Sequence, residues 1–518
     1  MHQRKYLIIA CLLFLAYFIN GIIAIPRLSI TYDEGDNLSY GIRFVKKHPE
    51  KVKPFDDAST MPMLAFNALP RAIEQLQNPD LKKNDDGFSD IISGRYFTLF
   101  LSAFIGLFIL RWSSELYGKA AGLFSLFLFV FCPNINANAV LVTTDALSCL
   151  FTVGTAYYFW KLMHRGSWKY VLLFSISIAL AQLAKQSLTH LLIIFFFLAS
   201  IFIVKNRKLP MFNRDLLFKS LSFIFIFLLV INAGFLFHKS GQSLSNYHFR
   251  SAFFQRVQNS LSFAGSIPMP LPEPYITGLD LTKNMDEMGA GRPETSGNNY
   301  ILGQSQTKGF WYYYFVSLFF KTPISVILLV FILAWMFWRK RTWNNNNELI
   351  PVFCIGYFMI YFDFFYNSQV GIRHVIMIFP LLYVLLGGVA NWLLSKKTIA
   401  AVFISYSIIT FYVFFPNLYA YSNELLPNKK DVYRVLGNAN IDYGQAYFLL
   451  QRYIAKHPEV KLAPDDPATG KFVLIAGEYL DINNTGKYKW LRQFEPIKEV
   501  EYCYLLFDIS EDDIKNLK

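Results

Sequence analysis

Long apolar runs divide the sequence, and each is about as long as a helix that crosses a lipid bilayer. Such a helix needs roughly 20 predominantly apolar residues. About eleven runs come near this length, at 6–26, 91–111, 120–140, 143–160, 170–184, 187–204, 215–236, 311–338, 349–366, 375–394 and 398–416. With 54% hydrophobic and 18% aromatic residues, the chain is too apolar for an ordinary soluble protein. The pattern predicts a polytopic α-helical membrane protein.

The basic residues indicate how the chain is oriented. A net charge of +13 would suit a nucleic-acid partner, but the charges form short clusters between apolar runs, and we therefore predict no nucleic-acid binding. If the N-terminus is inside, the clusters fall on cytoplasmic connections, as the positive-inside rule requires. They are Arg111 and Lys119; Lys161, Arg165 and Lys169; Lys205, Arg207, Lys208, Arg214 and Lys219; Arg339, Lys340 and Arg341; and Lys396 and Lys397.

An odd number of spans places the larger polar segments together on the outer side. These are loops 27–90 and 237–310 and the tail after the last span. We predict a transmembrane catalytic domain over 1–416 and a small extracytoplasmic α/β domain over 417–518. Within the tail, 432–456 has helical spacing, whereas 472–476 and 503–507 resemble short buried strands.

The two outer loops differ in pattern. In the first, apolar residues recur at helical spacing from Met61 to Leu76, interrupted by Pro70. This stripe suits either a helix lying on the membrane surface or one packed on the core. The second loop, 237–310, is rich in Gly, Pro, Ser and Asn and is expected to be mostly irregular. The five cysteines give neither a disulfide framework nor a zinc pattern.

Three acidic residues, Asp33, Glu34 and Asp36, follow the first apolar run. Acidic residues also decorate helix ends simply because water is near. A carboxylate cluster at the membrane surface, however, suits a general base, because neighbouring negative charge and partial desolvation raise the pKa of one member. We predict Asp33 as the base, with Glu34 as its catalytic neighbour.

Asp145 begins the fourth apolar run at the same outer face. It could complement the helix dipole, or it could line a substrate site. Two separated carboxylates are also able to hold a divalent cation. No recognised metal-binding spacing is present, so metal and cofactor dependence remain open.

Lys185 and Arg373 are the exceptions to the charge pattern, because they lie on connections predicted to be outside. Lys185 could merely extend toward lipid headgroups. If a substrate carries phosphate, Arg373 offers a bidentate clamp and Lys185 a point charge. His374 is predicted as a polar neighbour in the substrate site. Tyr313, in the aromatic stretch 309–315, belongs either to an interfacial belt or to a surface on which a sugar ring stacks.

Taken in order along the chain, these motifs resemble the bacterial dolichyl-phosphate-mannose protein mannosyltransferase-like glycosyltransferases. These enzymes belong to the GT-C superfamily, which also contains the lipid A aminoarabinose transferases. The matching motifs are Tyr32 to Glu34, Gly94 and Arg95, Thr144 and Asp145, Ala184 to Gln186, Tyr300 to Gln304, Gly309 to Tyr313, Lys321 to Pro323, Gly371 to Arg373, Pro380, Tyr421 to Leu425 and Asn440 to Gln445.

The resemblance implies a GT-C fold and inverting transfer of a sugar from a polyprenyl-phosphate donor. In that picture Asp33 takes the acceptor's proton, Arg373 and Lys185 hold the donor phosphate, and Asp145 shapes the cavity. The acceptor would be a protein hydroxyl, lipid A or a glycan of the envelope. The implied location is a bacterial inner membrane, with the site on the periplasmic or extracellular side.

Two other classes of protein compete with the enzyme. A transporter or flippase of a lipid-linked sugar usually places its charges near the bilayer midplane, often in repeated halves. Here the unusual charges gather at one face, and no internal repeat is visible. In a membrane-anchored sensor, the tail after the last span would be the functional domain. The tail contains one cysteine and neither a phosphate loop nor a metal-binding set.

Overall fold

The computed structural model describes residues 3–78, 88–205, 214–290, 297–340 and 346–517. Every predicted apolar run forms helix within these residues. The long or paired helices are α1 (Gln3–Ala24), α4 (Phe88–Tyr117), α5 (Lys119–Val130) with α6 (Pro133–Ala139), α7 (Thr144–Arg165), α8 (Trp168–Ala184), α9 (His190–Lys205), α10 (Arg214–Gly234), α13 (Tyr313–Lys321) with α14 (Ile324–Lys340), α15 (Asn346–Phe364), α16 (Ile378–Leu386) with α17 (Ala390–Ser395), and α18 (Lys397–Phe414).

The number of membrane-crossing helices depends on how strictly a span is defined. In the described residues, seven helices are long and apolar enough to cross a bilayer, or up to nine if each bent pair counts as one span. The bent pairs are α5 with α6, at 64°, and α13 with α14, at 114°. A proline marks each bend, because Pro133 begins α6 and Pro323 lies between α13 and α14. Helix α8 has 17 residues, and α7 carries charged residues at both ends. Neither helix is therefore counted among these spans. The predicted polytopic α-helical fold is confirmed.

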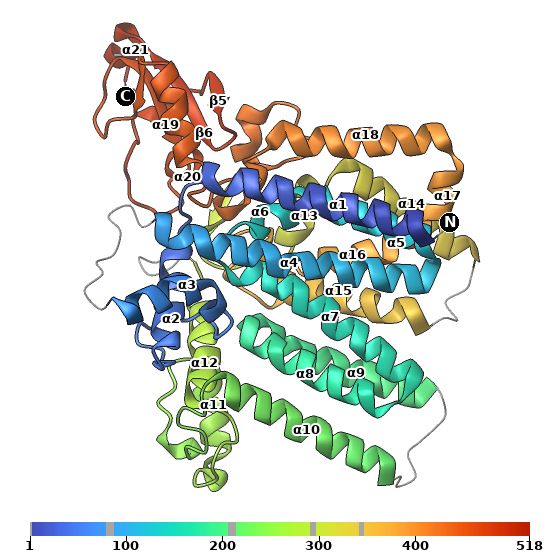
Figure 1. The fold of residues 1–518 in the computed structure, drawn as a ribbon. Helices are drawn as coiled ribbons and strands as arrows, with labels where there is room; N and C mark the ends of the chain where they lie inside the picture. Colours follow the sequence, from blue (N-terminus) through green and yellow to red (C-terminus); the bar gives the residue numbers. More distant parts are fainter. Residues whose placement is uncertain (1–2, 79–87, 206–213, 291–296, 341–345, 518) are drawn as a thin grey trace.

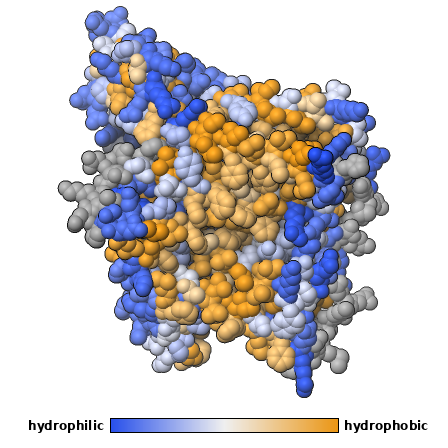
Figure 2. Space-filling view, in the orientation of Figure 1, coloured by the Kyte–Doolittle hydropathy of each residue, from blue (hydrophilic) through white to orange (hydrophobic). Residues whose placement is uncertain are grey.

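The helices form a bundle whose larger polar segments lie at one end (Figure 1). Helices α2 (Glu34–Val45), α3 (Leu64–Gln77), α11 (Ala252–Ser260) and α12 (Glu273–Met288) gather there with the C-terminal region, residues 417–518. The N-terminus lies at the opposite end. Figure 2 shows an apolar belt across the middle of the bundle, with hydrophilic residues toward both ends. Arg207, Lys208 and Arg341 of the predicted cytoplasmic clusters lie outside the described residues.

Loop 237–310 is more regular than we predicted, and the expectation of a mostly irregular segment is wrong. It contains α11, α12 and a hairpin of β1 (Asn299–Ile301) and β2 (Gln304–Gln306). Its prolines and glycines delimit helices rather than exclude them. Pro274 occupies the first turn of α12, and Gly289, with φ of 73°, ends it. Residues 291–296 of this loop lie outside the described part of the chain.

The apolar stripe of the first loop forms α3, which contains Pro70. Its Leu64, Ala68 and Ala72 are buried, whereas Ile73 and Leu76 are exposed. One face therefore packs on the core. The other face leaves Ile73 and Leu76 uncovered. The core-packing role of the stripe is thus confirmed, and its contact with a membrane surface stays a prediction.

The C-terminal region is a small α/β unit. Its four-stranded sheet has the order β3-β4-β6-β5, formed by Val460–Leu462, Gly470–Ile475, Tyr504–Ile509 and Lys498–Val500. Strand β4 pairs parallel with β3 and antiparallel with β6. Both predicted strands are present. The predicted helix at 432–456 forms only as α19 (Tyr447–Lys456), because Gly444 with φ of 90° interrupts the segment before it.

Candidate active site

The neighbouring carboxylates Asp33 and Glu34 have separate environments. Glu34 is completely buried and forms an ion pair with Arg95 of α4, which is also completely buried. Arg95 donates from Nε to Oε1 at 2.8 Å and from Nη2 to Oε2 at 2.5 Å. The backbone N–H of Val142 also donates to Oε1, at 2.8 Å. Glu34 thus joins α2 to α4 and to the connection before α7, and this geometry gives no support to its predicted catalytic role.

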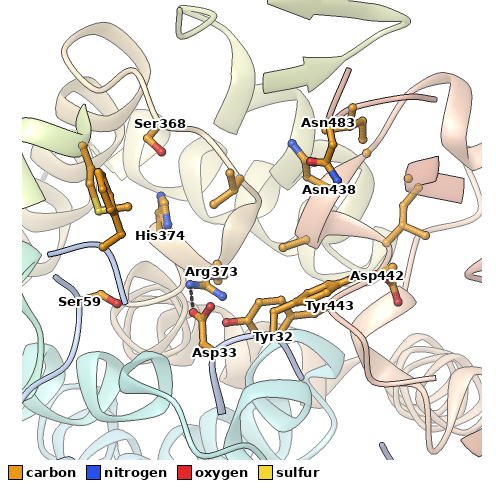
Figure 3. A pocket seen from close by; sticks show the side chains of 18 of the residues that line it. Tyr32, Asp33, Ser59, Ser368, Arg373, His374, Asn438, Asp442, Tyr443 and Asn483 are labelled. Atoms are coloured by element: carbon orange, nitrogen blue, oxygen red, sulfur yellow. Dashed lines mark hydrogen bonds and ion pairs between the residues drawn. The ribbon is translucent and has the colours of Figure 1, made fainter. Parts of the chain in front are cut away.

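Asp33 instead faces a cavity, where it meets Arg373 (Figure 3). Arg373 lies in a single 3₁₀ turn, Ile372–His374, between α15 and α16. Its Nη2 donates to Oδ2 of Asp33 at 2.5 Å, and its guanidinium lies 4.5 Å from the ring centre of Tyr443. The Nε of Arg373 is buried and makes no hydrogen bond to the described residues.

A second ion pair lies behind Arg373. The Nζ of Lys185 donates to Oδ1 of Asp145 at 2.5 Å, and Oδ2 of Asp145 lies 3.8 Å from Nε of Arg373. Lys185 also reaches the backbone oxygen of Arg373, at 3.4 Å. The structure thus brings together four residues that the sequence suggested separately. We call Asp33, Arg373, Asp145 and Lys185 the ion-pair chain; its two positive and two negative charges cancel.

The cavity has a volume of about 550 Å³. Of the other predicted residues, Asp36 and His374 line it. Tyr313 does not: it is fully buried, and its hydroxyl accepts a hydrogen bond from Asn440 at 3.1 Å. Burial, Lys185 and Arg373 lower the pKa of His374 well below its usual value. His374 is therefore neutral at pH 7 and adds no charge to the cavity.

The surroundings shift the pKa values of Arg373 and Asp36, two further ionisable groups that line the cavity. Burial alone would lower the pKa of Arg373, but Asp33 and the further negative groups around it raise that pKa well above its usual range. The guanidinium is thus a permanent cation. Burial and the nearby Asp56 raise the pKa of Asp36. An additional anion beside Asp36 would be unfavourable for the same reason.

Asn440 supports the turn that carries Arg373. Its Oδ1 accepts a hydrogen bond from the backbone N–H of Ile372 at 3.0 Å. Its backbone oxygen accepts one from the fully buried Lys321 at 2.5 Å. Helix α13, the C-terminal region and the Arg373 turn are therefore held by one small network.

Sequence reasoning missed several residues of the cavity wall. Tyr32 is 70% exposed and lies beside Asp33, and the C-terminal region contributes Asn438, Asp442, Glu478 and Asn483 (Figure 3). Tyr32 and Asp442 lie inside motifs that the sequence had already singled out. The hydrophobic periodicity of the sequence does not indicate Glu478 or Asn483, because only tertiary packing brings these residues of the C-terminal region to the cavity.

No group of three or more His, Cys, Asp or Glu side chains that could hold a metal occurs within the described residues. Both oxygens of Asp145 already face cations, Lys185 and Arg373.

One segment of the chain, residues 87–235, matches the model of a family described as dolichyl-phosphate-mannose-protein mannosyltransferase. The resemblance predicted from the motifs is confirmed for this segment, which includes Arg95, Asp145 and Lys185. No curated protein sequence matches the chain significantly.

Three solved structures are similar to the chain. The apo form of ArnT from Cupriavidus metallidurans shares 11% identity with a TM-score of 0.49; the similarity covers 84% of this chain and 66% of that one. The same protein bound to undecaprenyl phosphate shares 12% identity with a TM-score of 0.48, and the similarity covers 93% of this chain and 85% of that one. The apo oligosaccharyltransferase of Archaeoglobus fulgidus shares 12% identity with a TM-score of 0.47, and the similarity covers 79% of this chain and 54% of that one. The chain thus spans 66% of the first protein's length and 54% of the third's.

Proposed function

We propose, from the match of residues 87–235 to the mannosyltransferase family and from the cavity described above, that the chain is a glycosyltransferase. It transfers a sugar from a polyprenyl-phosphate donor to an acceptor at the outer membrane face. The observation that carries the proposal is the pairing of Asp33 with Arg373 on one cavity wall. A potential base and a permanent cation meet at the same point.

The chemistry that suits these groups is a direct displacement. The carboxylate of Asp33 takes the proton of an acceptor hydroxyl, and the oxygen's electron pair forms a bond to the anomeric carbon. The bond from that carbon to the phosphate oxygen breaks, and its electron pair leaves with the polyprenyl phosphate. Attack opposite the leaving group inverts the anomeric configuration. Arg373 stabilises the charge that develops on the phosphate.

The ion-pair chain couples these two events. When Asp33 gains a proton, its attraction for Arg373 weakens. At the same step the phosphate gains a negative charge, so the guanidinium can move its hydrogen bonds from the carboxylate to the leaving group. Lys185 and Asp145 hold Arg373 from behind. The total charge of the site is unchanged, because the proton that Asp33 gains offsets the negative charge that the phosphate gains. In this scheme Lys185 acts on the phosphate through Asp145 and Arg373.

The proposed location is a bacterial inner membrane, with the cavity on the periplasmic or extracellular side. The support is the pattern of basic residues, which assigns the end bearing the cavity to the outer face. The site lies at the end of the bundle where the large polar segments gather (Figure 1). An acceptor of the cell envelope would meet the enzyme there.

The test supplies purified protein with a panel of polyprenyl-phosphate sugars and measures release of polyprenyl phosphate. We expect turnover with at least one donor and its loss in Asp33→Asn. Absence of turnover with every donor would reject the enzyme and favour a transporter of lipid-linked sugar, which a flipping assay in vesicles would then detect. Turnover equal to wild type in Asp33→Asn would remove Asp33 as the base.

A further inference from the structure

The cavity has a second half that the proposed displacement does not use. Asp33, Arg373 and His374 line the half nearest the bundle, while the C-terminal region lines the other with Asn438, Asp442, Glu478 and Asn483. Figure 3 shows the rings of Tyr32 and Tyr443 between Asp33 and Asp442. Ligand cavities commonly measure about 300–1,000 Å³, and 550 Å³ leaves room for groups on both sides of these rings.

This second half contains hydrogen-bonding groups but no cation. Among the described residues that line the cavity, Arg373 is the only lysine or arginine, and it already pairs with Asp33. Neither Asp442 nor Glu478 has an ion-pair partner within the described residues. An anionic ligand would meet uncompensated like charge here.

The same groups suit hydroxyl donors. Carboxylate oxygens accept hydrogen bonds, and amides both accept and donate. Asn438 donates from Nδ2 to the backbone oxygen of Asn298 at 2.8 Å, which leaves its Oδ1 free to accept. Asn438 and Asn483 both line this wall (Figure 3). These acceptors are spaced along one surface, as a ligand with several hydroxyls requires.

Tyr32 adds an apolar platform to this wall. Its side chain is 70% exposed, although its backbone is held by a hydrogen bond from its N–H to the oxygen of Tyr443 at 3.1 Å. The ring is also in edge contact with Tyr443, with ring centres 6.1 Å apart. An exposed but positioned aromatic ring can cover the apolar C–H face of a sugar while its hydroxyl stays in water.

We propose that Tyr32 and the C-terminal wall form an acceptor subsite for an uncharged, hydroxyl-rich carbohydrate. The assignment rests on the proposed function, since it names the acceptor of that reaction. Tyr32 and Asp33 line the same cavity (Figure 3), so a sugar stacked on Tyr32 can present a hydroxyl toward the base. Asp442, Glu478 and the two asparagines bind hydroxyl groups farther from the reaction.

The test measures carbohydrate binding separately from catalysis. Saturation-transfer NMR on the full-length protein uses three neutral trisaccharides, maltotriose, mannotriose and N,N′,N″-triacetylchitotriose, and one anionic trisaccharide, trigalacturonate. We expect a neutral trisaccharide to bind more tightly than trigalacturonate. Failure of all three neutral probes, or equal binding of trigalacturonate, would overturn the proposal. Donor cleavage in the absence of acceptor is assayed in parallel, so loss of the enzyme proposal would appear in that assay and not in the NMR experiment.

Variants locate the binding. Glu478→Gln with Asn483→Ala removes acceptors from the wall and is expected to weaken binding of the neutral probe about tenfold or more. The matched control, Glu511→Gln with Asn516→Ala, makes the same chemical changes on exposed residues of α21 (Glu511–Lys515) and its end. Tyr32→Ala should abolish stacking, and Tyr32→Phe should retain it. Wild-type affinity in the folded Glu478 and Asn483 variant would reject the wall as the subsite.

Discussion

The Nη2 of Arg373 donates to Oδ2 of Asp33 across 2.5 Å, although the two residues are 340 positions apart. The pair faces the cavity, and Asp145 and Lys185 lie behind it. The hydrogen bond from Arg373 orients the carboxylate of Asp33 while the site is empty. A phosphate that competes for the same guanidinium would free the carboxylate of Asp33 to take the acceptor's proton.

Replacing Asp33 by Asn should lower transfer by about 10²–10⁴-fold, because an amide cannot accept the acceptor's proton. The measurement is kcat for sugar transfer at saturating donor. Asp508→Asn, on an exposed residue of β6, is the control and should retain wild-type kcat. Equal losses in both variants would point to a general charge effect and against a base at Asp33.

Replacing Arg373 by Lys should raise the donor KM, and replacing it by Ala should raise it further. Lys keeps the charge but lacks the planar fork that binds two phosphate oxygens. Removing a hydrogen-bonded charge from such a site costs about 2–5 kcal/mol. Arg434→Lys, at a half-exposed pair with Asp431, is the control. A donor KM unchanged in Arg373→Ala would mean that the phosphate binds elsewhere.

Glu34→Gln should reduce stability rather than act on the chemistry. It removes the carboxylate charge that pairs with the fully buried Arg95, and breaking a buried pair in this way costs about 3–5 kcal/mol. We expect a lower Tm in detergent and partial recovery when Arg95→Met removes the second charge. Glu74→Gln, on a half-exposed carboxylate, should leave Tm unchanged. A normal Tm with lost transfer would instead restore Glu34 as a catalytic group.

Asp442 should make stability fall as pH rises from about 4 to about 6. Burial raises the pKa of this carboxyl to about 6, whereas an unfolded aspartate titrates near 3.9. In this window the folded protein holds more protons than the unfolded chain, so the free energy of unfolding decreases with pH. Asp442→Asn should remove this part of the slope and raise Tm at pH 7. The measurement is Tm between pH 4 and 8 for wild type and Asp442→Asn, with Asp508→Asn as control. An identical slope of Tm against pH in wild type and Asp442→Asn would contradict the prediction.

The orientation in the membrane can be tested with single cysteines. Cys132, Cys149, Cys354 and Cys503 are buried, and Cys11 is exposed on the apolar helix α1, so Cys11→Ser provides the background. In intact cells, a maleimide that cannot cross membranes should label Glu511→Cys but not Lys397→Cys. Labelling of Lys397→Cys alone would place the cavity on the cytoplasmic side and remove the proposed envelope acceptor.

The local pattern predicted the helical bundle and both strands around 472 and 505, because apolar run length and alternation are properties of neighbouring residues. It also selected Asp33, Asp145, Lys185 and Arg373 as unusual charges for their positions. It failed for loop 237–310, where helices α11 and α12 lie between the prolines and glycines. Tertiary packing outweighs weak local preferences in such segments.

Sequence alone determined that this chain forms apolar helices and carries its exceptional charges near one end of them. Only the tertiary structure decided what those charges do. Asp33 and Glu34 are adjacent, yet one faces the cavity and Arg373, and the other is enclosed with Arg95. The physical reason is that successive residues at a helix start point in different directions, so partners hundreds of positions away determine which carboxylate is buried and which remains available to a ligand.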